Sequence, residues 1–382
     1  MLGAFALASD YADDLLIGAA RDVHGAFSKR AFRLTNKATG GSARVPQALH
    51  DGISRAVFTG VGAGVRAVSS GLRAAERRGM GPRLEDSARG RFVLSAVNGL
   101  IGDRLQDERP DFAITMGVRM RGQDVPLDPA HLAAAYPRAT GDLVVFLHGL
   151  CETEEYWNRN RQETGGSYGD RLDAETSWTP VMLRANTGLP IADNGVVLAS
   201  LLDSLVAAWP TEVRRIALVG HSMGGLIMRT ACAVVSDADI AWNTLVTNVV
   251  TLGSPHLGAP IAKTIHVGAA ALGRLPESAP FGRILEYRSV GILNLRGGLA
   301  PDIAALPHAR YHLVAATLAG SHRHPVSEVL GDMLVRYPSA VGRPRRGQEM
   351  FPGADVLHLP SAGHFDLLNH PEVYAAMKKW LG

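Results

Sequence analysis

The chain has 382 residues, of which 46% are hydrophobic and 20% are charged, a balance typical of a globular protein with a sizeable apolar core. Its formal net charge of +3 is small for this length and does not indicate a nucleic-acid partner. The two cysteines, Cys151 and Cys232, are too few for a disulfide framework or a cysteine-rich metal cluster, and they fit a reducing compartment.

Residues 1–90 are predicted to form a helical extension ahead of the main domain. Its apolar residues recur every three or four positions and form one stripe: Val45, Leu49, Ile53, Val57, Val61, Val65, Val68 and Leu72. The region is mildly basic, with 13 lysines and arginines against 8 acidic residues. We expect the stripe to pack on the main domain or on a second subunit. The alternative is weak attachment to a membrane surface, which the lack of tryptophan disfavours.

No signal peptide is expected, because a basic leading segment is missing and Asp10, Asp13 and Asp14 interrupt the first apolar run. The longest segment without charged side chains, residues 240–262, contains two prolines and is expected to be a core strand with a loop rather than a membrane span. These features predict a cytoplasmic protein, with peripheral membrane attachment through the N-terminal helices as the alternative.

A linker rich in glycine, proline and charged residues is predicted at 79–91, which places the main domain at 91–382. The expected elements of this domain are a helix over 92–105, a β-hairpin over 112–127, strands over 143–147 and 181–183, a helix over 191–209, a strand over 216–219 with a helix through 235, strands over 245–252, 311–318 and 356–359, and a helix over 371–381. Strands that alternate with helices predict an α/β fold with a mostly parallel sheet covered by helices on both faces.

Residues 257–310 separate two predicted strands by more than a compact domain needs, and such connections usually have a function. The segment contains a run of small apolar residues at 268–273 and the pairs Ile284 with Leu285 and Ile292 with Leu293. We expect a lid or cap over an apolar pocket; the alternative is a pair of ordinary helices at the edge of the sheet.

The chain centres on residues 215–225, which read RIALVGHSMGG. An uninterrupted apolar run at 216–219 is typical of a parallel strand buried on both faces, and helical spacing follows the turn. The turn fits the pattern G-x-S-x-G, with Ser222 between Gly220 and Gly224. A serine on a sharp strand-to-helix turn needs glycines on both sides, because the chain packs closely there. Ser222 is therefore the predicted nucleophile.

A second match to the same pattern, Gly165 to Gly169, follows a polar segment without a strand. We expect this segment to be a surface loop, so Ser167 is not the predicted nucleophile.

A serine nucleophile needs a base, and sites in open α/β sheets form at the carboxyl ends of the strands. His364 follows the last predicted strand and precedes the last helix, which makes it the predicted base. His370 is the alternative, although capping of the last helix explains it adequately, and His358 lies inside the strand.

The acid that orients this base should lie between the serine and the histidine in the chain. Asp332 is the preferred candidate, and its position alone leaves Asp302, Glu328 and Asp355 open. Asp355 begins the last strand and is therefore at the wrong edge of the sheet.

An oxyanion hole should combine the N–H that follows the nucleophile, here Met223, with an N–H after an earlier strand. His148-Gly149-Leu150 supplies such a loop, and the Leu150 N–H is the predicted donor. Cys151 is interpreted as a pocket-wall residue. Neither a zinc-ligand spacing nor a phosphate-binding glycine loop is recognisable, so no metal and no cofactor is expected.

The chain resembles the lipase and esterase branch of the α/β-hydrolase superfamily, and within it the PGAP1-like hydrolases related to bacterial triacylglycerol lipases. The resemblance is carried by segments starting at residues 143, 184, 218, 251, 331 and 363, which read LVVFLHGL, RANTGLPIADNG, LVGHSMGGL, TLGSPHLGAP, GDMLV and GHFDLLNHPEVY. It covers about residues 110–382. In such lipases the aspartate of a D-x-L-V segment is the triad acid, which matches Asp332. The one departure is Met333, where these lipases often have glycine.

The resemblance implies a serine hydrolase that cleaves carboxylic esters with Ser222, His364 and Asp332, acting on an ester or lipid-like substrate. The same triad would also serve an acyltransferase, an amidase or a thioesterase. A non-catalytic binding protein on a hydrolase fold is disfavoured, because all three triad residues are present.

Overall fold

The computed structural model describes residues 84–382 except 237, 239, 260–288, 296, 299–302, 325–326, 329–330 and 345–346. The chain divides into two compact units, residues 1–91 with 263–288 and residues 92–262 with 289–382. Of the first unit, residues 84–91 are described. The predicted stripe from Val45 to Leu72 and the small apolar run at 268–273 lie outside the described residues, so the N-terminal helices and the lid stay predictions.

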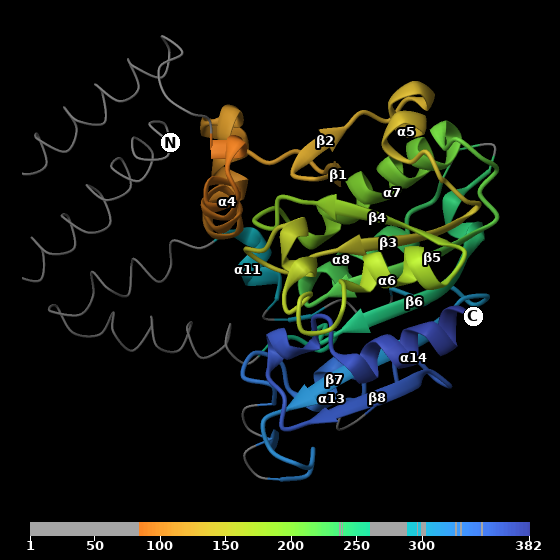
Figure 1. Cartoon of the computed structure of the whole chain (residues 1–382). Helices are drawn as coiled ribbons and strands as arrows, with labels where there is room; N and C mark the ends of the chain where they lie inside the picture. The colour runs from red at the N-terminus through yellow and green to blue at the C-terminus, as the bar shows by residue number, and fades with distance from the viewer. Residues whose placement is uncertain are drawn as a thin grey trace, which may run out of the picture. The chain divides into compact units, whose positions relative to one another are not determined.

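The second unit is built on an eight-stranded sheet (Figure 1). Its strands are β1 (Gly117–Met120), β2 (Gln123–Val125), β3 (Asp142–Leu147), β4 (Trp178–Arg184), β5 (Arg215–His221), β6 (Val246–Leu252), β7 (Arg310–Thr317) and β8 (Asp355–Pro360). They lie in the order β2-β1-β4-β3-β5-β6-β7-β8. Strand β1 pairs antiparallel with β2 and β4, and the strands from β4 to β8 pair in parallel. The predicted mostly parallel α/β sheet is confirmed.

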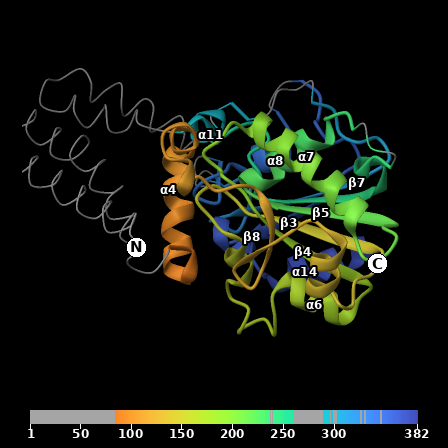
Figure 2. The same ribbon diagram turned by 90° about the horizontal axis from the view of Figure 1, so that it is seen from above.

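Helices cover both faces of the sheet. Figure 2 shows α7 (Ile191–Ala208) and α8 (Met223–Cys232) on one face, and α6 (Tyr168–Glu175) and α14 (Pro371–Leu381) on the other. Each central strand therefore contributes to two cores. In β3, Leu143, Val145 and Leu147 pack in the first core, whereas Val144 and Phe146 pack in the second. A strand buried on both faces needs apolar side chains at every position, which explains the uninterrupted run at 143–147.

The remaining helices are shorter or lie at the edges of the sheet. They are α4 (Ala88–Glu108), α5 (Pro129–Ala135), α11 (Val290–Asn294), α13 (Tyr337–Ala340) and the 3-10 turns Leu84–Asp86, Pro110–Phe112, Glu154–Asn158, Trp242–Leu245 and His364–Leu367. Helix α7 is the one described helix that is long and apolar enough to cross a membrane. It is half buried in the protein, and Leu198, Leu202 and Leu205 lie in the first core, which identifies it as a core helix.

Several predicted boundaries were wrong. The hairpin strand begins at Gly117 instead of residue 112, because Asn98 of α4 accepts a hydrogen bond from the Ile114 N–H (2.8 Å) and donates one to the Phe112 carbonyl (2.8 Å). The backbone of residues 112 and 114 is therefore bound to the Asn98 side chain and not to a neighbouring strand. The helix after the nucleophile ends at Cys232 and leaves Val235 exposed. Residues 88–91 of the predicted linker belong to α4.

The buried carboxylate of Asp142, at the beginning of β3, connects β3 with the beginnings of the neighbouring strands β4 and β5. It accepts hydrogen bonds from Ser177 (2.7 Å), Arg214 (3.1 Å) and Arg215 (3.1 Å). Burial raises the pKa of Asp142, but the hydrogen bonds from Arg215 and Ser177 and the charges of both arginines outweigh burial and hold the pKa below 3.8. The charged form is thus the one that the fold stabilises.

We expect Asp142→Asn to lower the free energy of unfolding at pH 7 by about 1–3 kcal/mol, because buried hydrogen bonds to a charged group are lost. A carboxyl whose pKa is lowered in the folded state contributes fully above its unfolded value and loses the contribution as pH falls through the folded value. The difference between wild type and variant in the free energy of unfolding, measured with urea, should therefore become smaller below pH 3.8. Asp173→Asn is the control, because its partner Arg138 is 80% exposed and surface pairs contribute little. If this difference in the free energy of unfolding does not change with pH, the stabilising role of the charged Asp142 is contradicted.

Candidate active site

Ser222 stands on a sharp turn between β5 and α8, with φ 51° and ψ −120°. This is a backbone conformation that L-residues rarely adopt, and it is held by a hydrogen bond from the Ser222 N–H to the Leu252 carbonyl (2.8 Å) at the end of β6. A Cβ at Gly220 would lie 2.5 Å from the Cα of Gly225, and one at Gly224 would lie 2.3 Å from the Leu147 carbonyl oxygen. The predicted steric reason for both glycines is confirmed.

Ser167 has a structural role, and its segment is not the surface loop that was predicted. It is buried and caps α6: its hydroxyl accepts a hydrogen bond from the Asp170 N–H (3.1 Å), while the Asp170 carboxylate accepts one from the Ser167 N–H (2.9 Å). A reciprocal capping box of this kind satisfies the free N–H groups at the start of α6.

The structure brings Asp332 and His364 together. The His364 Nδ1 lies 2.8 Å from the Asp332 Oδ2, and the His364 N–H donates to the Asp332 carbonyl (3.0 Å). The Asp332 Oδ1 accepts hydrogen bonds from the N–H groups of Leu334 (3.0 Å) and Val335 (2.7 Å), so the carboxylate is fixed on both sides. A carboxylate facing Nδ1 requires the proton there, which leaves Nε2 as an acceptor. This Nε2 is buried and has no hydrogen-bond partner among the described residues.

Asp332 reaches the site although it lies 15 positions beyond the end of β7 at Thr317. The intervening chain closes on itself, because the Leu318 N–H donates to the Gly331 carbonyl (3.0 Å) and returns the chain to the strand end. His364 follows the end of β8 and begins a 3-10 turn. Both residues are thus at the carboxyl edge of the sheet.

The alternative candidates lie elsewhere or have other partners. His370 caps α14 and accepts a hydrogen bond from the Glu372 N–H (3.3 Å), and the His358 Nε2 lies 2.8 Å from the Thr317 hydroxyl. Asp355 pairs with His312 (2.9 Å) at the start of β8. Glu328 is exposed, and Asp302 lies outside the described residues.

The loop after β3 passes against the nucleophile, because a Cβ on Gly149 would lie 2.9 Å from the Cβ of Ser222. The Gly149 carbonyl accepts hydrogen bonds from His148 Nδ1 (2.9 Å) and from the Glu152 N–H (3.2 Å). A trans peptide points its N–H opposite to its C=O, so the Leu150 N–H is directed away from both of these donors. No described residue accepts a hydrogen bond from this N–H.

Met223 is the first residue of α8, where the N–H groups have no partner inside the helix and the helix dipole favours negative charge. Both predicted oxyanion donors thus belong to segments that contact one another, since a Cβ on Gly224 would also lie 2.6 Å from the His148 carbonyl oxygen.

Cys151, next to this loop, is poorly suited to nucleophilic chemistry. Burial, together with the neighbouring charge of Glu152, raises the pKa of its thiol to about 11, so the thiolate is scarce near neutral pH. Its N–H donates to the Thr187 hydroxyl (3.1 Å). The interpretation of Cys151 as a wall residue stays a prediction.

The sequence reasoning missed a buried pair beside the triad, Glu152 and His221. The Glu152 carboxylate lies 2.9 Å from the His221 Nδ1 and accepts a hydrogen bond from the Gly149 N–H (2.7 Å), while the His221 Nε2 lies 3.3 Å from the His364 carbonyl oxygen. The available signal was an acidic residue two positions beyond His-Gly-Leu, but spacing alone could not pair it with a residue 69 positions away.

The electrostatics of this pair favour its charged form. Burial lowers the pKa of His221, but the charge and hydrogen bond of Glu152 outweigh it, and the pKa is raised above 6.5. Burial raises the pKa of Glu152, but the charge of His221 outweighs it, and the pKa is lowered below 4.5.

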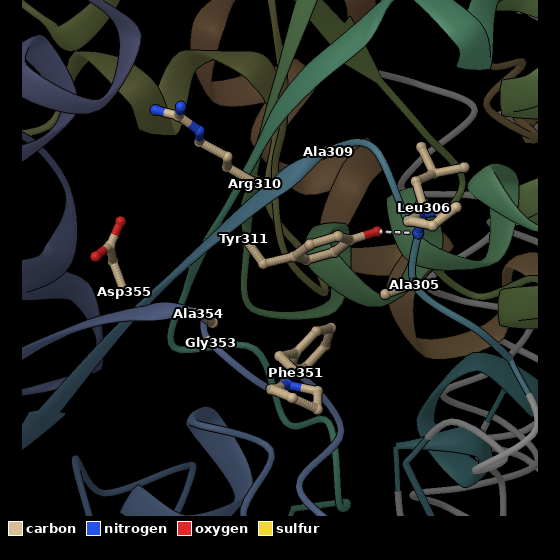
Figure 3. Close-up of a pocket in the computed structure, with 11 residues that line it drawn as sticks. Ala305, Leu306, Ala309, Arg310, Tyr311, Phe351, Gly353, Ala354 and Asp355 are labelled. Atoms are coloured by element: carbon tan, nitrogen blue, oxygen red, sulfur yellow. Dashed lines mark hydrogen bonds between the residues drawn. The ribbon is translucent and has the colours of Figure 1, made fainter.

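A cavity of about 630 Å³ lies at the other edge of the sheet, where β7 and β8 begin (Figure 3). It is lined by Ala305, Leu306, Pro307, Ala309, Arg310, Tyr311, Phe351, Pro352, Gly353, Ala354 and Asp355. Figure 3 shows the Tyr311 ring crossing it, with its hydroxyl accepting a hydrogen bond from the Leu306 N–H (2.8 Å). Ser222, Asp332 and His364 do not line this cavity.

The parallel sheet with an antiparallel first hairpin, the turn with Ser222 after β5 and the histidine after β8 are features of the α/β-hydrolase fold. Residues 138–286 match a family described as "Putative serine esterase (DUF676)". The match covers less than half of the chain, and it supports the resemblance to lipases and esterases.

Related proteins match parts of the chain. A triacylglycerol lipase of Burkholderia plantarii is 30% identical over 145 residues, 37% of this chain and 37% of that protein. A triacylglycerol lipase of Pseudarthrobacter phenanthrenivorans is 29% identical over 136 residues, 35% of this chain and 37% of that protein. The crystal structure of a Bacillus licheniformis lipase in its propeptide form has a TM-score of 0.46 at 18% identity and covers 70% of this chain and 53% of that one. The chain thus spans little more than a third of the length of these curated relatives.

Met333, the departure from the lipase pattern, has φ 91° and a side chain that is 66% exposed. It follows the acid residue Asp332, so the strained backbone belongs to the loop that holds the carboxylate. Glycine adopts such a conformation without a Cβ penalty.

We expect Met333→Gly to be more stable than Met333→Ala by about 1 kcal/mol, because glycine relieves the positive φ and both variants lose the same exposed side chain. In ordinary backbone, glycine would be the less stable of the two. Urea unfolding of the two variants measures the difference, and a Met333→Ala protein as stable as the glycine variant would contradict the strain.

Proposed function

We propose that the protein is a serine hydrolase that cleaves carboxylic esters through Ser222, His364 and Asp332. The observation that carries the proposal is the Asp332–His364 pair, whose Nε2 is buried without a described partner at the same edge of the sheet as the Ser222 elbow. The match to an esterase family over residues 138–286 supports ester hydrolysis, and the partial likeness to triacylglycerol lipases supports a lipid-like substrate.

In the proposed reaction, the Ser222 hydroxyl attacks the carbonyl carbon of the ester while the His364 Nε2 takes its proton. The negative charge that develops on the carbonyl oxygen is stabilised by the N–H groups of Leu150 and Met223. Asp332 holds the Nδ1 proton and stabilises the imidazolium. His364 then protonates the leaving alcohol, and the acyl-enzyme is hydrolysed by a water molecule that gives its proton to Nε2. An alcohol in place of this water would turn the reaction into acyl transfer.

Substitution of Ser222 tests the nucleophile. Hydrolysis of p-nitrophenyl esters with acyl chains from C2 to C16 should be lost in Ser222→Ala, by about 10⁴-fold or more in kcat, because the acyl-enzyme can no longer form. Ser167→Ala is the matched control: it fits the same sequence pattern and should retain activity, with a loss of about 1 kcal/mol in stability from the missing cap.

The outcomes separate the alternatives. Activity in the wild type that survives in Ser222→Ala would contradict the nucleophile. A wild type that hydrolyses no ester but reacts at Ser222 with a fluorophosphonate would keep the triad and overturn the ester substrate, which directs the search to amides and thioesters. Ester products formed from an added alcohol would indicate acyl transfer.

Substitution of Asp332 tests the acid. Asp332→Asn should reduce kcat by about 10⁴-fold, because an amide cannot hold the Nδ1–H tautomer of His364 or stabilise its imidazolium. Asp355→Asn is the matched control, since Asp355 pairs with His312 at the other edge of the sheet. The acid role is contradicted if both variants lose activity equally or if Asp332→Asn retains it.

A further inference from the structure

One buried carboxylate, that of Glu152, links three distant segments of the proposed site. It accepts a hydrogen bond from the Gly149 N–H (2.7 Å) in His148-Gly149-Leu150, the loop after β3 that carries a predicted oxyanion donor and is called the oxyanion loop below. It also pairs with His221 (2.9 Å), the residue before the predicted nucleophile. His221 in turn contacts the backbone carbonyl of His364 (3.3 Å). Glu152 is 3% exposed and His221 is 0% exposed, so water does not replace these contacts.

The partners of His221 require a proton on each of its nitrogens. A carbonyl oxygen only accepts hydrogen bonds, so the Nε2 that faces His364 carries a proton. An ionised carboxylate also only accepts, so the Nδ1 that faces Glu152 carries one as well. His221 is therefore an imidazolium paired with a carboxylate, and both of its nitrogens are used in holding the structure.

Residue 152 fixes both peptide groups beside Gly149. Its side chain accepts a hydrogen bond from the Gly149 N–H, and its own N–H donates to the Gly149 carbonyl (3.2 Å). This carbonyl belongs to the same peptide group as the Leu150 N–H. The Glu152 carbonyl accepts a hydrogen bond from the Ser95 hydroxyl of α4, which anchors the turn from behind. Rotation of the 149–150 peptide would turn the predicted oxyanion donor away from the site.

We propose that Glu152 is a positioning residue. It holds the oxyanion loop in place beside Ser222 directly, and it holds the backbone of His364 in place through His221. The proposal rests on the proposed esterase function. It adds the contacts that hold the oxyanion loop, the segment before Ser222 and the backbone of His364 in their relative positions. Glu152 does not touch the reacting atoms, so its removal should reduce turnover and leave substrate binding nearly unchanged.

Three substitutions at Glu152 separate its shape from its charge. In Glu152→Gln the amide oxygen can accept from the Gly149 N–H and the amide N–H can donate to a neutral His221, which keeps every hydrogen bond. Glu152→Asp keeps the charge but is one methylene too short to reach both partners. Glu152→Ala removes both interactions.

The matched control is Glu154→Gln. Glu154 lies two residues further along, is 6% exposed and pairs with Arg119 Nε (3.1 Å), but no described hydrogen bond or ion pair joins its side chain to the proposed site. It therefore reports the cost of disturbing a buried acid in the same turn.

We expect kcat for a p-nitrophenyl ester to fall by about 100-fold in Glu152→Ala, the scale of a misplaced group or a lost oxyanion donor, with KM changed less than about threefold. Glu152→Asp should lose about 10-fold or more, and Glu152→Gln should stay within about threefold of wild type, on the same scale. Glu154→Gln should lower the midpoint of urea unfolding without changing kcat.

The kcat of each folded variant tests the positioning role. If Glu152→Ala does not fold, Glu152→Asp provides the test. Wild-type kcat in Glu152→Asp or Glu152→Ala would overturn the positioning role while Ser222→Ala remains inactive, which leaves the esterase proposal intact. A Glu152→Gln enzyme as slow as Glu152→Asp would also overturn it, since a variant that keeps every hydrogen bond would then be no faster than one that loses them. Failure of the esterase proposal shows instead as activity that Ser222→Ala does not abolish.

Discussion

The strained backbone of Ser222 is the constraint on which the rest of the site depends. A side chain at φ 51° is tolerated only where the surrounding chain leaves it no other conformation. Here the Ser222 N–H is bound to the end of β6, Gly220 packs against α8, and Gly224 packs against the end of β3. Three adjacent parallel strands therefore determine where the hydroxyl lies, and their buried cores supply the rigidity.

Parallel strands bring their carboxyl ends to one edge, and this topology gathers residues that are far apart in the chain. The loop after β3, the elbow after β5 and the histidine after β8 meet without any local sequence relation. Asp332 is the exception, because its chain leaves the end of β7 and returns through the hydrogen bond between Leu318 and Gly331. Position along the chain therefore left other acidic residues open beside Asp332, and the family pattern strengthened the preference for it.

The elements that were predicted from the sequence are those whose signal is local. The run at 216–219 with its glycines specifies a buried strand and a tight turn within eleven residues, and the structure follows it. The errors arise where a distant side chain decides the outcome: Asn98 binds residues 112 and 114 and delays the first strand, and Asp170 makes Ser167 a helix cap. Glu152 was missed for the same reason, since its partner is 69 positions away and periodicity carries no information on such pairs.

Three pairs between a carboxylate and a buried histidine in the described part of the chain show why pairing alone does not define a catalytic base. In each, an acid holds the Nδ1 of a histidine, so the second nitrogen distinguishes them. The His312 Nε2 lies 3.0 Å from the Asn248 side-chain oxygen, and the His221 Nε2 lies 3.3 Å from the His364 carbonyl. Both nitrogens of each of these two rings are therefore engaged in contacts within the protein. The His364 Nε2 alone among the three has no described partner, and a buried acceptor left unsatisfied is costly unless a proton donor from substrate or nucleophile reaches it.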